Sequence, residues 1–142
     1  MAGTVTDELN AILAMRTAPE YRAAERLRRY VTAEVMARCP ESSEEYPAIR
    51  LLIGTWETIA VRVQGNAPLK TPFFQANPVG HMWDALAPAI KVIRGSLKGQ
   101  TSTKRFYAAN FEKLNKAYRT WLASQPASYR SAALQGINAQ FG

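Results

Sequence analysis

The chain has 142 residues, enough for one domain with its own hydrophobic core, and 47% of them are hydrophobic. A single cysteine, Cys39, excludes an internal disulfide and a cysteine-rich metal site. The formal net charge of +7 is uneven: residues 1–84 sum to −1, whereas residues 85–142 hold Glu112 as their one acid and sum to +8. This asymmetry favours an anionic partner, which is nucleic acid, an anionic membrane surface or an acidic protein. The alternative is a solvated basic face without a specific partner.

The N-terminus has neither the basic region nor the apolar run of a signal peptide. No uncharged apolar segment approaches the roughly 20 residues that span a bilayer. We therefore expect a cytoplasmic (intracellular) protein without a transmembrane segment.

Two helices are expected before residue 46. The first runs from about Thr6 to Arg16, with Thr6 as the N-cap. The second begins at Pro19 and reaches about Arg38. Its apolar side is formed by Tyr21, Ala24, Leu27, Val31 and Val35, and its polar side adds Arg22, Arg26, Arg28 and Arg29 to the basic surface.

The strongest helical pattern lies between Pro47 and Gly65. Its apolar stripe consists of Ile49, Leu52, Ile53, Trp56, Ile59, Ala60 and Val63. Pro47 fits the first helical position, and Gly65 fits a left-handed residue after the last turn. We expect this to be the central helix of the fold.

Residues 68–78, with three prolines, are expected to form an ordered connector whose Leu69, Phe73 and Phe74 cover the core. A fourth helix should run from about Val79 to Leu97, kinked or split at Pro88. Its apolar residues are Val79, Met82, Trp83, Leu86, Ile90, Ile93 and Leu97.

A fifth helix is predicted from about Thr103 to Ser124. Its apolar side carries Tyr107, Phe111, Leu114, Tyr118 and Trp121, and its opposite side carries Arg105, Glu112, Lys116 and Arg119. A weaker terminal helix follows Pro126. Together these patterns predict one all-α domain over residues 1–142, an irregular five- or six-helix bundle with N-terminal helices in 1–46, core helices in 47–124 and a tail or helix in 125–142.

Catalytic signatures are scarce. His81 is the only histidine, which excludes histidine-based triads and multi-histidine zinc sites. No glycine-rich phosphate loop is present, and we expect no metal and no cofactor. Glu57 and Glu112 are the candidates for acid–base chemistry, because carboxylates near a core can act in hydrolysis. The alternative interpretation is that each carboxylate forms an ion pair with a cation of a neighbouring helix.

The candidate anion- or partner-binding residues are the cations of the basic half, Lys91, Lys98, Lys104, Arg105, Lys116 and Arg119. Aromatic residues are interleaved with them, which is typical of single-strand binding by phosphate contact and stacking. Helical phase places Tyr107, Tyr118 and Trp121 on the core side, however, so phosphate contact is the stronger half of this hypothesis. Glu57 and Arg94 both flank apolar stripes, and we expect them to form a structural ion pair between the third and fourth helices.

The chain also resembles a family of uncharacterised bacterial helical domains that often follow a membrane anchor. The resemblance spans roughly residues 47–115 and consists of Trp56-Glu57-Thr58-Ile59-Ala60 with Val63 and Gly65, then Trp83 and Ile90 to Arg94, then Phe106-Tyr107 and Phe111-Glu112-Lys113-Leu114. It implies an all-helical domain with no assigned activity. This sequence departs from the family in having no anchor and in its proline-rich connector at 68–78, where the family tends to have a short acidic helix.

We therefore expect a non-enzymatic interaction protein, of the kind that a phage or mobile element carries, whose basic C-terminal half binds an acidic protein surface or nucleic acid. The alternative is a structural subunit of a larger assembly, such as a virion or filament, and a homo-oligomer is compatible with either. The third hypothesis is a hydrolase that uses Glu57 or Glu112.

Overall fold

A computed structural model of the chain describes residues 4–31, 45–96 and 106–129, and the secondary structure within these ranges is helical. In chain order the elements are α1 (Val5–Thr17), α2 (Pro19–Arg29), α4 (Glu45–Gln64), the 3-10 turn η1 (Ala67–Leu69), α5 (Lys70–Ala76), α6 (Val79–Ser96) and α7 (Ala109–Ala123). The predicted all-α class is confirmed for this part of the chain.

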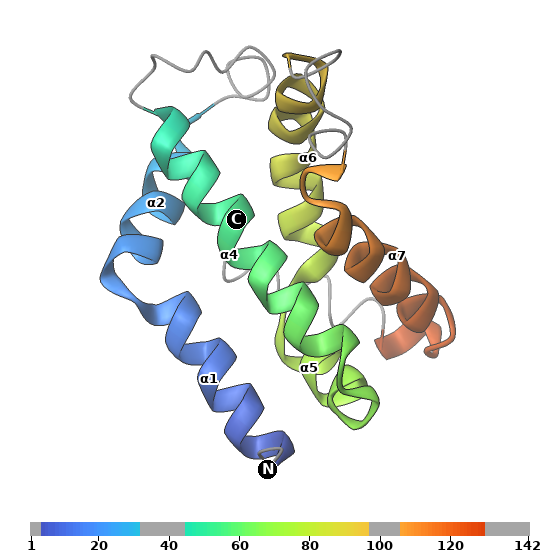
Figure 1. Cartoon of the computed structure of the whole chain (residues 1–142). Coiled ribbons are helices and arrows are strands. Elements are labelled where there is room, and N and C mark those ends of the chain that lie inside the picture. Colours follow the sequence, from blue (N-terminus) through green and yellow to red (C-terminus); the bar gives the residue numbers. More distant parts are fainter. Residues whose placement is uncertain (1–3, 32–44, 97–105, 130–142) are drawn as a thin grey trace.

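Helix α4 is the centre of the molecule. It runs between α1 and α2 on one side and α6 and α7 on the other, and it packs mainly against α2 and α7 (Figure 1). Every residue of the predicted stripe is buried: Ile49, Leu52, Ile53, Trp56, Ile59, Ala60 and Val63. Trp56 has no exposed surface and stacks on Phe111 of α7, with ring centroids 5.6 Å apart. Full burial of one such side chain stabilises the fold by about 2 kcal/mol, and the seven residues of this stripe form the central part of the core.

The ends of α4 differ from the prediction. The helix already includes Glu45, so Pro47 is its third residue, where the missing N–H still costs no hydrogen bond. Gly65 follows the last turn and donates to the Val61 carbonyl at 3.3 Å, but its φ lies outside the left-handed region. The left-handed residue of the described chain is instead Ala108, with φ of 62°.

The start of α1 and the end of α2 also differ from the prediction. The N-cap of α1 is Thr4, not Thr6, because Thr4 and Asp7 form a reciprocal capping box. Helix α2 ends at Arg29 and is followed by Tyr30, which is 87% exposed. Residues 32–38 of the predicted helix, among them Val35 and Arg38, lie outside the described residues, as does Cys39.

The predicted connector is ordered, and Leu69, Phe73 and Phe74 are buried as expected. It is helical rather than irregular, because Pro68 lies at the start of η1 and Pro72 in the first turn of α5, where proline is tolerated. Helix α6 is not split at Pro88, since it continues from Val79 to Ser96 with the proline inside it. Leu97, at the predicted end of this helix, is not among the described residues.

Helix α7 begins at Ala109, later than the predicted start near Thr103. Phe111, Leu114 and Tyr118 of its apolar side are buried, and Tyr107 and Trp121 are partly buried against the same core. After Pro126, residues 127–129 form a single helical turn, and the rest of the predicted terminal helix lies beyond the described residues.

Candidate functional site

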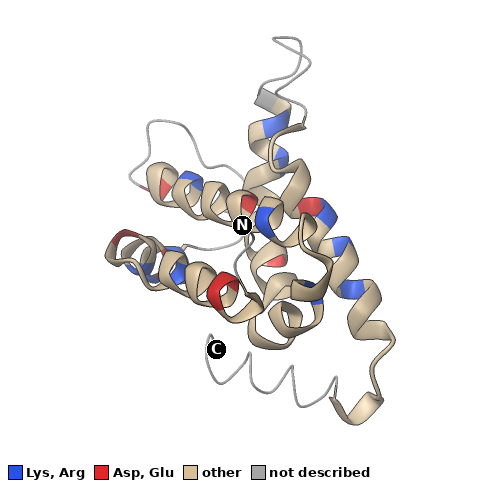
Figure 2. Cartoon of the chain, turned by 60° about the horizontal axis from the view of Figure 1, so that its bottom comes forward, with Lys and Arg blue, Asp and Glu red and all other residues tan. Residues whose placement is uncertain are grey.

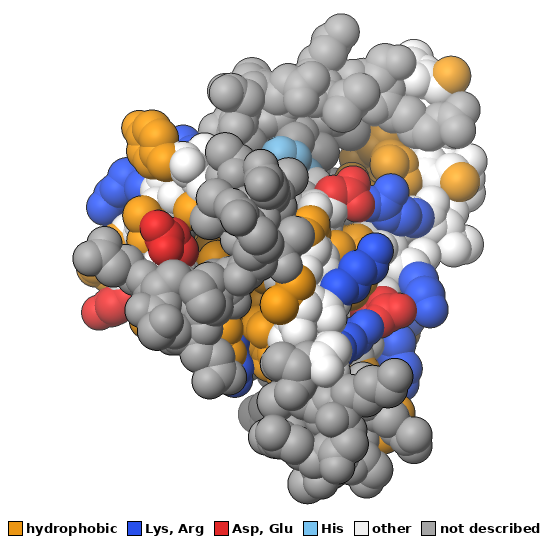
Figure 3. Space-filling model, turned by 90° about the horizontal axis from the view of Figure 1, so that it is seen from above, with side chains coloured by type: hydrophobic (Ala, Val, Ile, Leu, Met, Phe, Trp, Pro, Cys, Tyr) orange, Lys and Arg blue, Asp and Glu red, His pale blue; other side chains and the backbone are white. Residues whose placement is uncertain are grey.

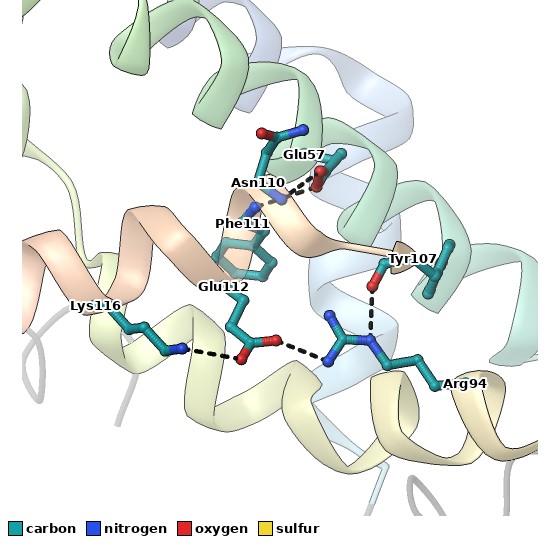
Figure 4. Close-up of polar contacts among 7 residues, drawn as sticks. All are labelled: Glu57, Arg94, Tyr107, Asn110, Phe111, Glu112 and Lys116. Atoms are coloured by element: carbon teal, nitrogen blue, oxygen red, sulfur yellow. Dashed lines mark hydrogen bonds and ion pairs between the residues drawn. The ribbon is translucent and has the colours of Figure 1, made fainter. Parts of the chain in front are cut away.

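The most elaborate polar arrangement in the described chain holds the start of α7. Ala108 is the N-cap and its side chain offers no acceptor, so the first N–H groups of the helix need partners from elsewhere. Glu57 of α4 supplies them. Its carboxylate accepts from the backbone N–H of Asn110 at 2.7 Å and of Phe111 at 3.1 Å (Figure 4). A negative charge at this position also interacts favourably with the helix dipole.

Arg94 of α6 holds the same segment from the other side. Its Nε donates to the Tyr107 carbonyl at 2.8 Å, and its Nη1 donates to Glu112 Oε1 at 2.7 Å (Figure 4). Lys116 lies 3.5 Å from the second oxygen of the same carboxylate. The hydrogen bond from Arg94, aided by the charges of Arg94 and Lys116, lowers the pKa of Glu112 despite partial burial.

These contacts change the predicted role of Glu57 and Arg94. Each was expected to be the other's ion-pair partner, but each binds a different part of the segment 107–112. Sequence periodicity had correctly placed both beside the core. It could not show that a backbone segment between the helices, rather than the opposite charge, would be the partner.

The same contacts bear on the hydrolase hypothesis. The Glu57 carboxylate accepts two backbone hydrogen bonds, and the Glu112 carboxylate forms ion pairs with Arg94 and Lys116. Proton transfer by either group would weaken contacts that fix the start of α7. Within the described residues, no group of three or more His, Cys, Asp and Glu side chains is placed to hold a metal ion.

Three of the six candidate partner-binding residues, Lys98, Lys104 and Arg105, lie outside the described residues. Lys91 is exposed on α6. On α7, the side chain of Lys116 is 73% exposed and that of Arg119 is 50% exposed. Arg119 lies 2.7 Å from Asp84 of α6 and also contacts Asn115 and the Gly80 carbonyl.

Lys and Arg residues recur along α7 after a single acid near its start (Figure 2). Lys113 adds a further exposed cation to those already named. Acidic side chains nevertheless lie beside basic ones on the face seen in Figure 3. Glu112 lies beside Lys116 and Asp84 of α6 lies beside Arg119, so the exposed cations of α7 form a basic face with two acids next to it, not a continuous basic surface.

The aromatic residues of α7 are turned toward the core, as helical phase predicted. Tyr118 is 5% exposed and meets Phe74 edge to face at 5.6 Å. Trp121 is tilted against the same phenylalanine at 5.5 Å. Among the interleaved aromatics, Phe106 is the exposed one, at 57%. These two aromatic side chains of α7 thus pack against α5, and the exposed aromatic, Phe106, precedes the helix.

Sequence reasoning missed one arginine-rich site. It noted the arginines of α2 but not Arg16 of α1, which lies with Arg22, Arg26 and Arg29 around one pocket. The signal was present, since Arg16 precedes the turn that ends at Pro19, but the angle between the two helices cannot be read from periodicity.

The described helices include none that combines the length and apolar character needed to cross a bilayer. Searches against protein-family models, curated proteins and solved structures return no match to this chain.

Proposed function

We propose that this chain is a non-enzymatic interaction protein, a single five- or six-helix bundle that binds an acidic protein surface through the basic face of its C-terminal half. The observation that supports this most directly is the division of α7. Phe111, Leu114 and Tyr118 are buried on one side, while Lys113, Lys116 and Arg119 are exposed on the other. A helix fixed at its start by two neighbours presents these cations on a rigid support.

An acidic protein is favoured over nucleic acid for two reasons. Among the aromatic side chains interleaved with the cations, Tyr118 is in the core, Tyr107 and Trp121 pack against it, and Phe106 alone is exposed for stacking on bases. In addition, Glu112 and Asp84 lie among the cations and would repel a continuous phosphate backbone, whereas a protein surface of mixed charge can match them.

The test begins with capture of partners from a lysate of the native cell, with and without nuclease, followed by binding measurements with the purified partner. The variant Lys113→Gln/Lys116→Gln should weaken that binding by about tenfold, the effect of losing a few rim charges. The matched control Arg22→Gln/Arg26→Gln removes the same charge from α2 and should bind normally. Loss of capture on nuclease treatment, or equal weakening by both variants, would overturn the proposal.

Nucleic acid has its own measurable signature. A duplex oligonucleotide could bind with an affinity that falls steeply with salt, with a log–log slope near the number of phosphates contacted. In that case the partner is nucleic acid and not an acidic protein, but the basic face is still the binding surface. Affinity for the protein partner should fall less steeply, because a protein surface carries no condensed counterion layer.

A structural subunit of a larger assembly is the second candidate, and one surface favours it. A groove of about 340 Å³ between α2 and α4 is lined largely by apolar side chains, among them Leu27 and Leu51, which are 39% and 40% exposed. Self-association through this groove predicts a large species on size exclusion at micromolar concentration. A monomer there would remove this candidate.

A further inference from the structure

Two ion pairs connect α6 and α7, one at each end of the contact between these helices. Arg94 Nη1 lies 2.7 Å from Glu112 Oε1, where the end of α6 meets the start of α7 (Figure 4). Arg119 Nη2 lies 2.7 Å from Asp84 Oδ1, nearer the start of α6. Because the first pair joins the end of one helix to the start of the other, the two helices are antiparallel along this contact.

Two lysines lie between these ion pairs. Lys91 follows Asp84 by two turns of α6 (i, i+7), so it lies in the same row of that helix, and it is exposed. Lys116 follows Glu112 by one turn of α7 (i, i+4), and its side chain is 73% exposed. Since the helices are antiparallel, the two lysines lie on rows that face each other. We call this surface the α6–α7 seam, and its charged residues are Asp84, Lys91, Arg94, Glu112, Lys116 and Arg119.

The α6–α7 seam is neutral at its ends and positive in its middle. The arginine–carboxylate pair at each end sums to zero. In the middle, Lys116 lies 3.5 Å from an oxygen of Glu112, whose charge is already offset by its arginine. Lys91 forms no ion pair within the described part of the chain. A carboxylate that binds between the two lysines therefore meets an excess of positive charge.

The acids at the ends of the seam limit the length of the negative charge that can bind. Asp84 and Arg94 are ten residues apart, which is about 15 Å along α6. Glu112 and Arg119 are seven residues apart, which is about 10 Å along α7. The positive middle of the seam is shorter than these distances. A longer run of negative charge would meet the carboxylates of Asp84 and Glu112, and like charges across an interface disfavour a partner.

We propose that the α6–α7 seam binds a short acidic cluster of a protein partner. The cluster consists of two carboxylates about 6 Å apart, the spacing of positions i and i+4 on a helix, on a surface that is otherwise neutral. Lys91 and Lys116 each bind one of these carboxylates. This inference rests on the proposed function, and it specifies the chemistry of the partner at that face. It also adds a residue of α6 to the binding surface.

The experiment is an NMR titration of the full chain at low ionic strength with three alanine-rich helical peptides of about 20 residues. The first carries two glutamates at positions i and i+4 in its centre, the second has glutamine at both positions, and the third carries glutamates along its whole length. We expect the first peptide to shift the amide resonances around Lys91 and Lys116, and the second to shift neither. The third should bind no more tightly than the first, despite its larger charge.

Two single variants make the same change of charge inside and outside the seam. Lys91→Gln should weaken binding of the first peptide by about threefold, the loss that one exposed charge contact causes. Lys113→Gln is the matched control and should leave the affinity unaltered, because Lys113 lies about 100° around α7 from Glu112. Both lysines are exposed, so the other amide resonances of each variant should match those of the wild type.

The proposal is overturned if no amide of α6 or α7 shifts at about millimolar concentration of the first peptide. It is also overturned if Lys113→Gln weakens binding as much as Lys91→Gln, or if affinity rises with every added glutamate. A duplex oligonucleotide that displaces the first peptide more effectively than the third peptide does would assign the seam to nucleic acid instead.

Failure of the seam is distinguishable from failure of the proposed function. If the captured partner binds Lys113→Gln/Lys116→Gln more weakly but Lys91→Gln normally, the basic face of α7 remains the binding surface and the seam is wrong. If the captured partner binds the double variant normally, the proposed function is wrong.

Discussion

The first turn of α1 takes its cap from its own sequence, whereas the first turn of α7 takes its cap from another helix. In α1, Thr4 accepts from the Asp7 N–H at 3.0 Å, and the Asp7 carboxylate accepts from the Thr4 N–H at 3.2 Å. In α7, the N-cap residue is Ala108 in a left-handed conformation. The hydrogen-bond acceptor is the carboxylate of Glu57, a residue of α4 more than 50 positions earlier in the chain. A local cap forms with its helix, but a distant cap requires the packed fold.

The largest effect should follow removal of the distant cap. Glu57→Ala leaves two partly buried N–H groups without acceptors, and we expect it to lower the free energy of unfolding by about 2 kcal/mol. Urea denaturation at neutral pH measures this. The control Thr58→Ala alters an exposed neighbour on the same helix and should cost far less. A loss below about 0.5 kcal/mol for Glu57→Ala would show that α7 starts at Ala109 for local reasons.

Arg94→Met should have the next largest effect, about 1 kcal/mol, because the arginine is partly exposed and methionine keeps much of its packing. It also gives a titration readout. The pKa of Glu112 lies below its usual value in the folded chain, so its contribution to stability is present above about pH 4.5 and is lost as the pH falls through the folded pKa.

In Arg94→Met the pKa of Glu112 should therefore rise, and part of this acid-induced loss of stability should disappear. Carboxyl chemical shifts followed by NMR would show the change. If the pKa of Glu112 is the same in the variant, then Lys116, not Arg94, sets it.

Removal of the local cap should cost less. Thr4→Ala is expected to lower the free energy of unfolding by about 0.5–1 kcal/mol, because the cap is exposed and the end of α1 can fray. Hydrogen exchange at the Asp7 amide should accelerate in the same variant. Thr6→Ala is the matched control, because the sequence pattern had favoured Thr6 as the cap. Equal costs for the two variants would contradict the observed capping box.

This contrast also explains which features the sequence could predict. The stripe from Ile49 to Val63 is buried as predicted, because helical period alone decides which side of α4 is apolar. The burial of Phe73 and Phe74 followed from their size and apolar character. These inferences depend on residues close together in the chain.

Features that depend on distant residues were not predictable in the same way. Glu57 and Arg94 were placed beside the core, but their partners in the segment 107–112 depend on how α4, α6 and α7 cross. The pocket around Arg16 depends on the angle at which α1 meets α2. The helix starts illustrate the same limit. The N-cap of α1, Thr4, lies two residues from the predicted N-cap, whereas the acceptor at the start of α7 comes from α4, which no local pattern indicates.

The start of α6 gives the smallest expected effect. His81 lies in its first turn, and burial lowers the pKa of this histidine, with a further lowering by Arg28 that Glu25 and Asp84 oppose. The folded chain therefore binds this proton less readily than the unfolded chain, whose histidine titrates near 6.5. Since the unfolded state then holds more protons, stability should decrease as the pH is lowered through 6.5 toward the folded pKa. His81→Gln should reduce this decrease, measured as the difference in urea midpoint between about pH 7.5 and 5.5. If wild type and variant lose stability equally over that interval, the loss does not come from His81, and the start of α6 is insensitive to the charge of its histidine.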